Sequence, residues 1–139
     1  MALNGLLGSG KNGAWSCHPI EHEWSAHYDI THGVGLAILT PSWMRYILNE
    51  DTVDKFVDYA TNVWHIPMKD DKFALANEGI DVTENFFKEC GIPMTLREVG
   101  IDDSKFDEMA KASVKYGGLQ DAYVSLNEED VYKILTMCL

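Results

Sequence analysis

The sequence predicts an all-α domain, a helical bundle of about six helices, and three observations support this. Apolar residues recur at three- and four-residue spacing over most of the chain, which is the periodicity of helices with one buried face. No stretch alternates strictly between apolar and polar residues with many β-branched side chains, as a half-buried strand would. The length of 139 residues and the apolar content of 46% suit one domain with its own core.

The first two predicted helices form the part of the chain in which the candidate site lies. A helix over about residues 14–28 follows a glycine-rich opening, and a second helix covers about residues 32–48. The second is almost wholly apolar, so residues 34–48 are predicted to form the most buried segment. Pro41 is expected to bend or interrupt this helix, because proline lacks the amide hydrogen that the helical hydrogen bond needs.

Two further helices are predicted in the middle of the chain. Residues 53–64 place apolar side chains at helical spacing with Asp and Lys between them, which indicates an amphipathic surface helix. Gly91 followed by Pro93 marks the end of a fourth helix, expected over about residues 70–90. The apolar stripe of that helix is predicted to consist of Phe73, Ala76, Ile80, Phe87 and Cys90.

The last two helices are predicted from the residues at their ends. Ser104 is expected to cap a helix that runs through about Tyr116 and is ended by the glycine pair 117–118. Asn127 and Asp130 have the spacing of a reciprocal cap for the final helix. The buried face of the final helix is predicted to consist of Val131, Ile134, Leu135 and Cys138.

Composition argues against several classes of partner and location. The 22 acidic and 11 basic residues give a net charge of −11, which would repel a phosphate backbone, so no nucleic acid is expected. No membrane span is expected, because no apolar run approaches about 18 residues, and residues 1–13 lack the pattern of a secretory signal. Cys17, Cys90 and Cys138 are far apart and odd in number, as expected for reduced thiols in a cytoplasmic protein.

Charge and histidine are distributed unevenly along the chain. Residues 1–49 contain three acidic and two basic side chains, whereas residues 50–139 contain 19 and nine. Four of the five histidines fall within the near-neutral first segment, close together in sequence. Among the five, His27 on the apolar side of its helix and the isolated His65 are expected to be structural.

The segment GLLGSGKNG, residues 5–13, contains two patterns found in phosphate-binding loops. It satisfies both GxGxxG and GxxxxGK, which bring glycine backbone close to phosphates at a helix N-terminus. Both patterns need a preceding strand, but only residues 1–4 precede this loop, and Asn12 stands where a phosphate loop has Ser or Thr. Residues 1–13 are therefore expected to be a lead-in to the first helix, rather than a nucleotide site.

His18 and His22 have the i, i+4 spacing that turns two imidazoles to the same side of a helix. Together with Ser25 and Asp29 they form one stripe, and the apolar residues of the helix lie on the roughly opposite face. The two histidines are thus placed away from the core, where both a metal site and solvated surface histidines fit the pattern. His32 begins the next helix, and a helix hairpin could return it toward His18.

The string CHPIEHEWSAHYDITHGVGLAILTPSWM resembles the metal-binding signature of the iron-containing alcohol dehydrogenases. The pattern is His18-x3-His22-x9-His32-Gly33, continued by Gly-Leu-Ala and by Pro-x-Trp-Met. The resemblance covers the whole chain and points especially to the NAD(P)H-dependent butanol dehydrogenase branch of that family. It implies that this chain has the fold of the family's helical C-terminal domain.

The resemblance also implies a role for each histidine of the motif. His18 and His32 match the two metal ligands that the C-terminal domain supplies, and His22 matches the histidine between metal and nicotinamide that relays a proton. Enzymes of this family reduce aldehydes or oxidise primary alcohols with Fe2+, which Zn2+ replaces in some members, and with NAD(P)H as hydride donor. The implied ligands are therefore a small alcohol or aldehyde substrate, a divalent metal and NAD(P)H.

The chain also departs from the family's pattern. Family members have an upstream α/β domain that carries the dinucleotide site and two more metal ligands, an aspartate and a histidine, for which residues 1–139 offer no match. Asp29 lies about 16 Å by helical rise from His18, so it is expected to cap the turn and not to ligate. The 139 residues are expected to be the C-terminal, metal-binding half of such an enzyme, inactive without the N-terminal α/β domain. The alternative is a non-catalytic acidic helical domain for interaction or homo-oligomer formation.

Overall fold

The computed structural model describes residues 15–139, which form six α-helices and two short 3₁₀ helices. Their bounds are α1 Cys17–Tyr28, α2 His32–Ile47, α3 Val53–Asn62, α4 Lys72–Glu89, η2 Arg97–Val99, α5 Phe106–Gly117, η3 Leu119–Asp121 and α6 Glu128–Met137. The described residues contain no strand, so the predicted all-α fold with six helices is confirmed. The glycine-rich loop of residues 5–13 lies outside them, and its lead-in role stays a prediction.

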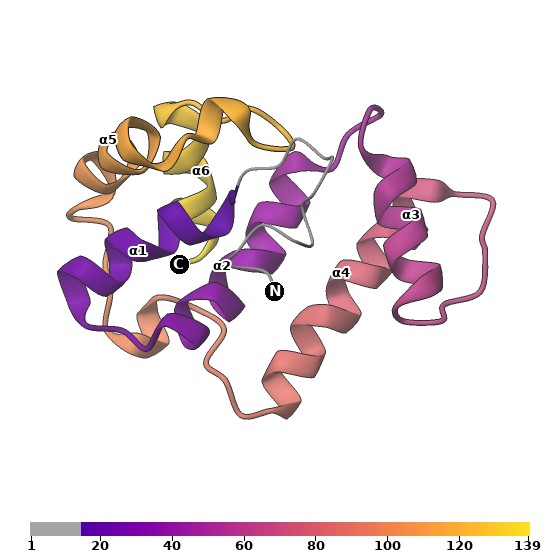
Figure 1. The fold of residues 1–139 in the computed structure, drawn as a ribbon. Coiled ribbons are helices and arrows are strands. Elements are labelled where there is room, and N and C mark those ends of the chain that lie inside the picture. Colours follow the sequence, from indigo (N-terminus) through magenta and orange to yellow (C-terminus); the bar gives the residue numbers. More distant parts are fainter. Residues whose placement is uncertain (1–14) are drawn as a thin grey trace, which may run out of the picture.

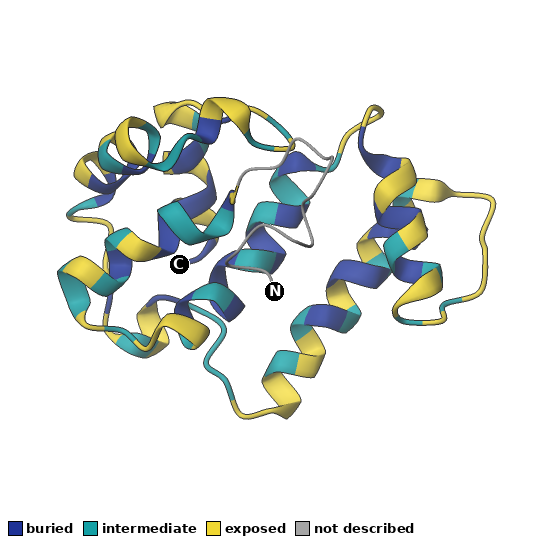
Figure 2. Ribbon diagram, viewed as in Figure 1, coloured by how far each residue is buried: buried dark blue, intermediate teal, exposed yellow. Residues whose placement is uncertain are grey.

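Helix α2 is the central element of this fold. It contacts α1, α4 and α6, and Figure 1 shows it between the group of α1, α5 and α6 and the pair of α3 and α4. Half of its residues are buried, a larger share than in any other α-helix of residues 15–139. Figure 2 shows these buried positions along α2, while the outer sides of its neighbours are exposed. The predicted burial of residues 34–48 is therefore confirmed.

Pro41 does not interrupt α2. The helix is continuous from His32 to Ile47 with Pro41 inside it. Pro41 is itself buried, and the preceding Thr40 hydroxyl donates a hydrogen bond to the carbonyl of Leu36 (2.6 Å). Packing on three neighbouring helices thus compensates for the hydrogen bond that proline cannot donate.

The ends of α4 agree with the prediction, but its buried face does not. The Asp71 side chain caps the helix by accepting a hydrogen bond from the Ala74 amide (2.9 Å), and Gly91 follows the helix in the left-handed region (φ 77°). The predicted stripe is wrong at Cys90, which is exposed, because the fully buried part of α4 ends at Thr83. The buried positions are Leu75, Ala76, Gly79, Ile80 and Thr83.

The start of α5 also differs from the prediction. Ser104 does not cap the helix, since its hydroxyl donates to the carboxylate of Asp102 (2.5 Å) and Lys105 occupies the cap position without a side-chain hydrogen bond. The predicted end is confirmed, because Gly118 follows the helix in the left-handed region (φ 65°), a conformation that glycine adopts without strain. Ser104 therefore belongs to the preceding turn.

The predicted cap of α6 is confirmed as a reciprocal pair. Asn127 Oδ1 accepts hydrogen bonds from the amides of Glu129 (2.8 Å) and Asp130 (3.1 Å), and Asp130 Oδ2 accepts from the Asn127 amide (2.8 Å). The predicted inner face of the helix is buried as well, with Val131, Ile134, Leu135 and Cys138 all in the core. The cap thus fixes where the last core helix begins.

Replacing Asn127 with alanine is expected to lower the free energy of unfolding by about 1 kcal/mol, because two amides at the start of α6 lose their acceptor. Urea denaturation measures the change. Asn77→Ala is the matched control, since Asn77 lies inside α4, where alanine is the better helix former. Equal denaturation midpoints for Asn127→Ala and the unmodified chain would contradict the role of this cap.

The three cysteines are all free thiols. Burial raises the pKa of the Cys17 thiol to about 12, and burial does the same for Cys138. Both side chains stay protonated at neutral pH and are poor nucleophiles in that form.

None of the helices in residues 15–139 combines the length and hydropathy of a bilayer span.

Candidate metal centre

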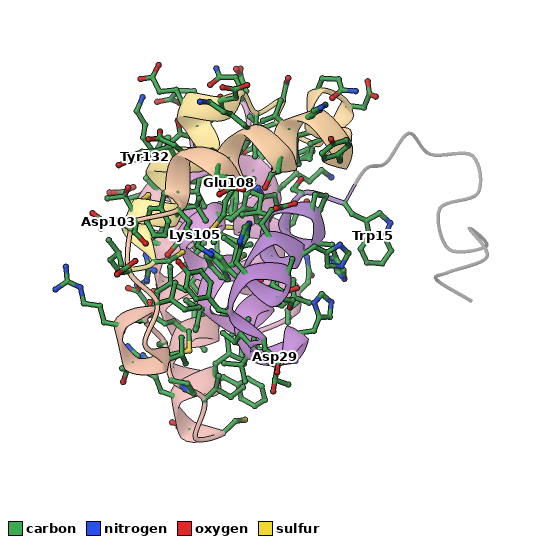
Figure 3. The ribbon with its side chains drawn as sticks, turned by 90° about the vertical axis from the view of Figure 1, so that its left-hand side faces the viewer. Trp15, Asp29, Asp103, Lys105, Glu108 and Tyr132 are labelled. Carbon is green, nitrogen blue, oxygen red and sulfur yellow. The ribbon has the colours of Figure 1, made fainter. Side chains whose placement is uncertain are left out.

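The turn between α1 and α2 places three histidines together. Helix α1 ends at Asp29, which adopts the left-handed conformation (φ 52°) and donates its amide to the Ser25 carbonyl (3.2 Å). Asp29 therefore caps the turn, as predicted, and Figure 3 shows it at the opposite end of α1 from Trp15. Only two residues separate Asp29 from His32, so the chain reverses immediately and α2 begins beside α1.

The imidazole rings of His18, His22 and His32 form a cluster on this hairpin. The ring centroids of His18 and His32 are 5.2 Å apart, those of His22 and His32 are 5.3 Å apart, and those of His18 and His22 are 6.2 Å apart. The hairpin thus returns His32 to His18, although the two residues are fourteen positions apart in sequence. Imidazoles that converge in this way can bind a metal ion.

The other two histidines lie outside this cluster. His27 is half-buried on α1, where its Nε2 lies 3.9 Å from the Glu23 carboxylate and its Nδ1 lies 3.3 Å from Lys105 Nζ. His27 therefore links α1 to the residue that precedes α5, in agreement with a structural role. His65 is exposed after α3 and has a left-handed backbone (φ 55°), so it is no part of the core.

The histidine cluster is open to ligands from outside. Trp15, His18, Pro19, His22 and His32 line a surface depression of about 420 Å³. A second depression, of about 210 Å³, lies between α1 and α5 and shares Pro19 and His22 with the first. Trp15 packs edge-on against His18, with ring centroids 4.2 Å apart, and projects from the start of α1 (Figure 3). His22 therefore borders both depressions.

The electrostatic environment favours neutral imidazole at His18. Burial lowers the pKa of His18, and the neighbouring His32 and His22 lower this pKa further, while Glu21 acts in the opposite direction. A lowered pKa keeps the ring neutral at physiological pH, and the neutral ring is the form that coordinates metals.

A buried carboxylate beneath the cluster was not predicted as part of the site. Glu21 on α1 is fully buried, and its Oε2 accepts a hydrogen bond from His32 Nδ1. The burial of Glu21 could have been predicted from the sequence. Glu21 lies three residues before Trp24 and four after Cys17, on the apolar face of the helix. A carboxylate on a buried face needs a partner, and histidine is one.

The donor atoms present fit a transition metal. Imidazole nitrogen and carboxylate oxygen are both ligands of Fe2+ and Zn2+ in proteins. Among residues 15–139, the three side chains whose donor atoms all lie within 4.8 Å of one another are Glu21, His22 and His32. The cluster therefore offers two donor sets, one made of His18 and His32 and the other of these three side chains.

Comparisons with known proteins agree with the fold and the motif. Residues 2–139 match the sequence model of the Fe-containing alcohol dehydrogenase family, C-terminal. The chain is similar to NADH-dependent butanol dehydrogenase A of Clostridium acetobutylicum, with 55% identity over 135 residues, which are 96% of this chain and 35% of that protein. It is also 39% identical over 142 residues to the probable NADH-dependent butanol dehydrogenase 1 of Bacillus subtilis, covering all of this chain and 36% of that protein.

Solved structures show the same fold within longer chains. The crystal structure of NADH-dependent butanol dehydrogenase A from Thermotoga maritima superposes with a TM-score of 0.83 at 33% identity, over 99% of this chain and 36% of that chain. E. coli YqhD superposes with a TM-score of 0.86 at 27% identity, over 99% of this chain and 35% of that one. The chain thus spans little more than a third of the length of these relatives.

Proposed function

The chain belongs to the iron-containing alcohol dehydrogenase family as its helical C-terminal domain, and we propose that it is the metal-binding part of an NAD(P)H-dependent alcohol dehydrogenase of the butanol dehydrogenase branch. The proposed reaction is the reduction of a small aldehyde, or the oxidation of the corresponding primary alcohol, in the cytoplasm. In this proposal the dinucleotide binds to an N-terminal α/β domain outside the chain. The observation that carries the proposal is the convergence of three imidazoles on an open surface depression.

Each histidine of the cluster has a separate role in this proposal. His18 and His32 hold the divalent metal, Fe2+ or Zn2+, which when bound polarises the oxygen of the aldehyde or alcohol. His22 is exposed where the two depressions meet, so its ring can exchange a proton with solvent and with a substrate in the depression. Trp15 and Pro19 provide the apolar part of the wall around a bound substrate.

A titration of the chain with Zn2+, followed by NMR of the histidine side chains, tests the metal site. We expect saturable binding of a single ion that shifts the ring resonances of His18 and His32, because those two rings are the proposed ligands. His65→Ala is the matched control, since His65 is exposed and far along the chain from the cluster, and this variant should bind Zn2+ as the unmodified chain does.

The same titration tests the alternative function. Binding that is not saturable, or that shifts only resonances outside the cluster, would favour a non-catalytic acidic helical domain for interaction or homo-oligomer formation. In that case the histidines would be solvated surface residues.

A further inference from the structure

We propose that Glu21 is a positioning residue that fixes the tautomer and the orientation of the His32 ring. The inference rests on the proposed function, because His32 is one of the two proposed metal ligands. It assigns to Glu21 no contact with substrate or cofactor, only the preparation of His32 for binding.

The burial of Glu21 is the first observation behind this proposal. Glu21 is 0% exposed, between the core residues Ile20 and Trp24, and it is the only buried charged side chain among residues 15–139. Removing a carboxylate from water costs free energy unless hydrogen bonds replace the lost solvation. A buried carboxylate next to the histidine cluster therefore has to be held by specific partners.

Both oxygens of Glu21 have such a partner. Oε1 accepts a hydrogen bond from the Ser25 hydroxyl (2.7 Å), and Oε2 accepts one from His32 Nδ1. A carboxylate oxygen can only accept here, so the ring hydrogen of His32 lies on Nδ1. In the neutral ring, Nε2 then carries the lone pair and is the nitrogen available to a metal. Carboxylates orient many metal-binding histidines in this way.

Helix α2 is built to leave room for Glu21. A Cβ atom at Gly35 would lie 2.5 Å from Glu21 Oε1 and 2.6 Å from Glu21 Cγ. Because Glu21 is buried, a larger residue at position 35 would have to push its carboxylate out of its present position. The absence of a side chain at Gly35 and the position of the Glu21 carboxylate thus depend on each other.

Direct ligation by Glu21 is the competing interpretation, since its donor atoms lie within 4.8 Å of those of His22 and His32. Two facts favour the positioning role. Both carboxylate oxygens already accept hydrogen bonds, and the side chain lies in the core, whereas His22 and His32 are exposed at the depression. A metal bound by Glu21 would have to displace the hydrogen bond that orients His32.

The first experiment measures the His32 tautomer by ¹⁵N NMR of the metal-free chain. In the unmodified chain and in Glu21→Gln, whose amide oxygen still accepts a hydrogen bond, we expect the hydrogen on Nδ1. Glu21→Ala should lose this preference. Glu23→Gln is the matched control, because Glu23 lies on the same helix and contacts His27, not His32. An unchanged tautomer in Glu21→Ala would overturn the proposal.

The second experiment measures the Zn2+ affinity of the same variants. We expect Glu21→Ala to weaken binding by about 10- to 100-fold, the usual effect of removing a carboxylate behind a ligating histidine, with Glu21→Gln in between. If Glu21→Ala and Glu21→Gln lost equal amounts of Zn2+ affinity while the His32 tautomer stayed unchanged in both, Glu21 would be a metal ligand. Absence of Zn2+ binding by the unmodified chain would refute the proposed function, while the NMR result would still decide the role of Glu21.

Gly35→Ala provides a second variant that retains the carboxylate. The new methyl group should displace Glu21 from His32, so the tautomer preference should be lost as in Glu21→Ala. Circular dichroism shows whether the helices are retained in each variant. A folded Gly35→Ala chain with the unmodified tautomer would show that the position of Glu21 does not control His32.

Discussion

Changing His22 to alanine is expected to leave the metal in place and to lower kcat by about 10²- to 10⁴-fold, the usual contribution of a proton-transfer group. His18→Ala and His32→Ala should instead lose the metal, and with it all turnover. The variants are best compared in a chimaera in which this chain replaces the matching C-terminal part of butanol dehydrogenase A from Clostridium acetobutylicum. The 55% identity between the two sequences favours correct docking of the domain.

The three histidine rings are held differently, and this is the physical reason for assigning His18 and His32 to metal binding and His22 to proton transfer. His32 is fixed by Glu21, and His18 packs edge-on against Trp15, so both rings are oriented before a ligand arrives. His22 has no side-chain hydrogen-bond partner within residues 15–139 and is exposed at the junction of the two depressions. A ring that can turn toward solvent suits proton transfer better than ligation.

Metal content and NADH oxidation in the presence of butanal measure the two effects separately. His65→Ala in the same chimaera is the control for the loss of an exposed histidine, and both quantities should be unchanged in it. Loss of the metal in His22→Ala together with its retention in His18→Ala would assign the ligand set to Glu21, His22 and His32. The proposed division of roles would then be wrong.

The parts of the fold that follow from short-range patterns could be predicted from the sequence. The apolar composition of α2 identified it as the central helix, and the spacing of Asn127 and Asp130 identified the cap of α6. Ser104 failed as a cap because Asp102, two residues earlier, binds its hydroxyl in the turn. Cys90 failed as a core residue because helical periodicity shows which residues share a face, but not how far a neighbouring helix covers that face.

The candidate site could be predicted only in part, because some of its contacts join residues of two different helices. The i, i+4 spacing of His18 and His22 and the short turn before His32 are local, so the meeting of the three rings could be expected. The contact of Glu21 with His32 joins residues eleven positions apart, and the room for Glu21 depends on Gly35 of the second helix. Such a contact depends on the exact crossing of α1 and α2, which the periodicity of either helix does not specify.

A polypeptide of residues 1–139 alone is expected to show no alcohol dehydrogenase activity. Hydride transfer needs a bound nicotinamide, and dinucleotides are normally bound by a βα turn at the edge of a parallel sheet, whereas residues 15–139 contain no strand. Catalytic metal sites usually have about three protein ligands, and this proposal assigns two to the chain, so the metal should also be held weakly.

The measurement follows NADH and NADPH oxidation by the polypeptide with butanal and either Fe2+ or Zn2+, with the chimaera as the positive control under the same conditions. We expect turnover from the chimaera and none above background from residues 1–139, even with the metal in excess of its dissociation constant. Excess metal separates the two expected causes of inactivity, weak metal binding and the lack of a dinucleotide site. It compensates for weak metal binding but cannot supply a dinucleotide site. Metal-dependent turnover, or saturable NADH binding by residues 1–139, would mean that these helices contain a dinucleotide site of their own, and the glycine-rich segment 5–13 would then be the first place to look for it.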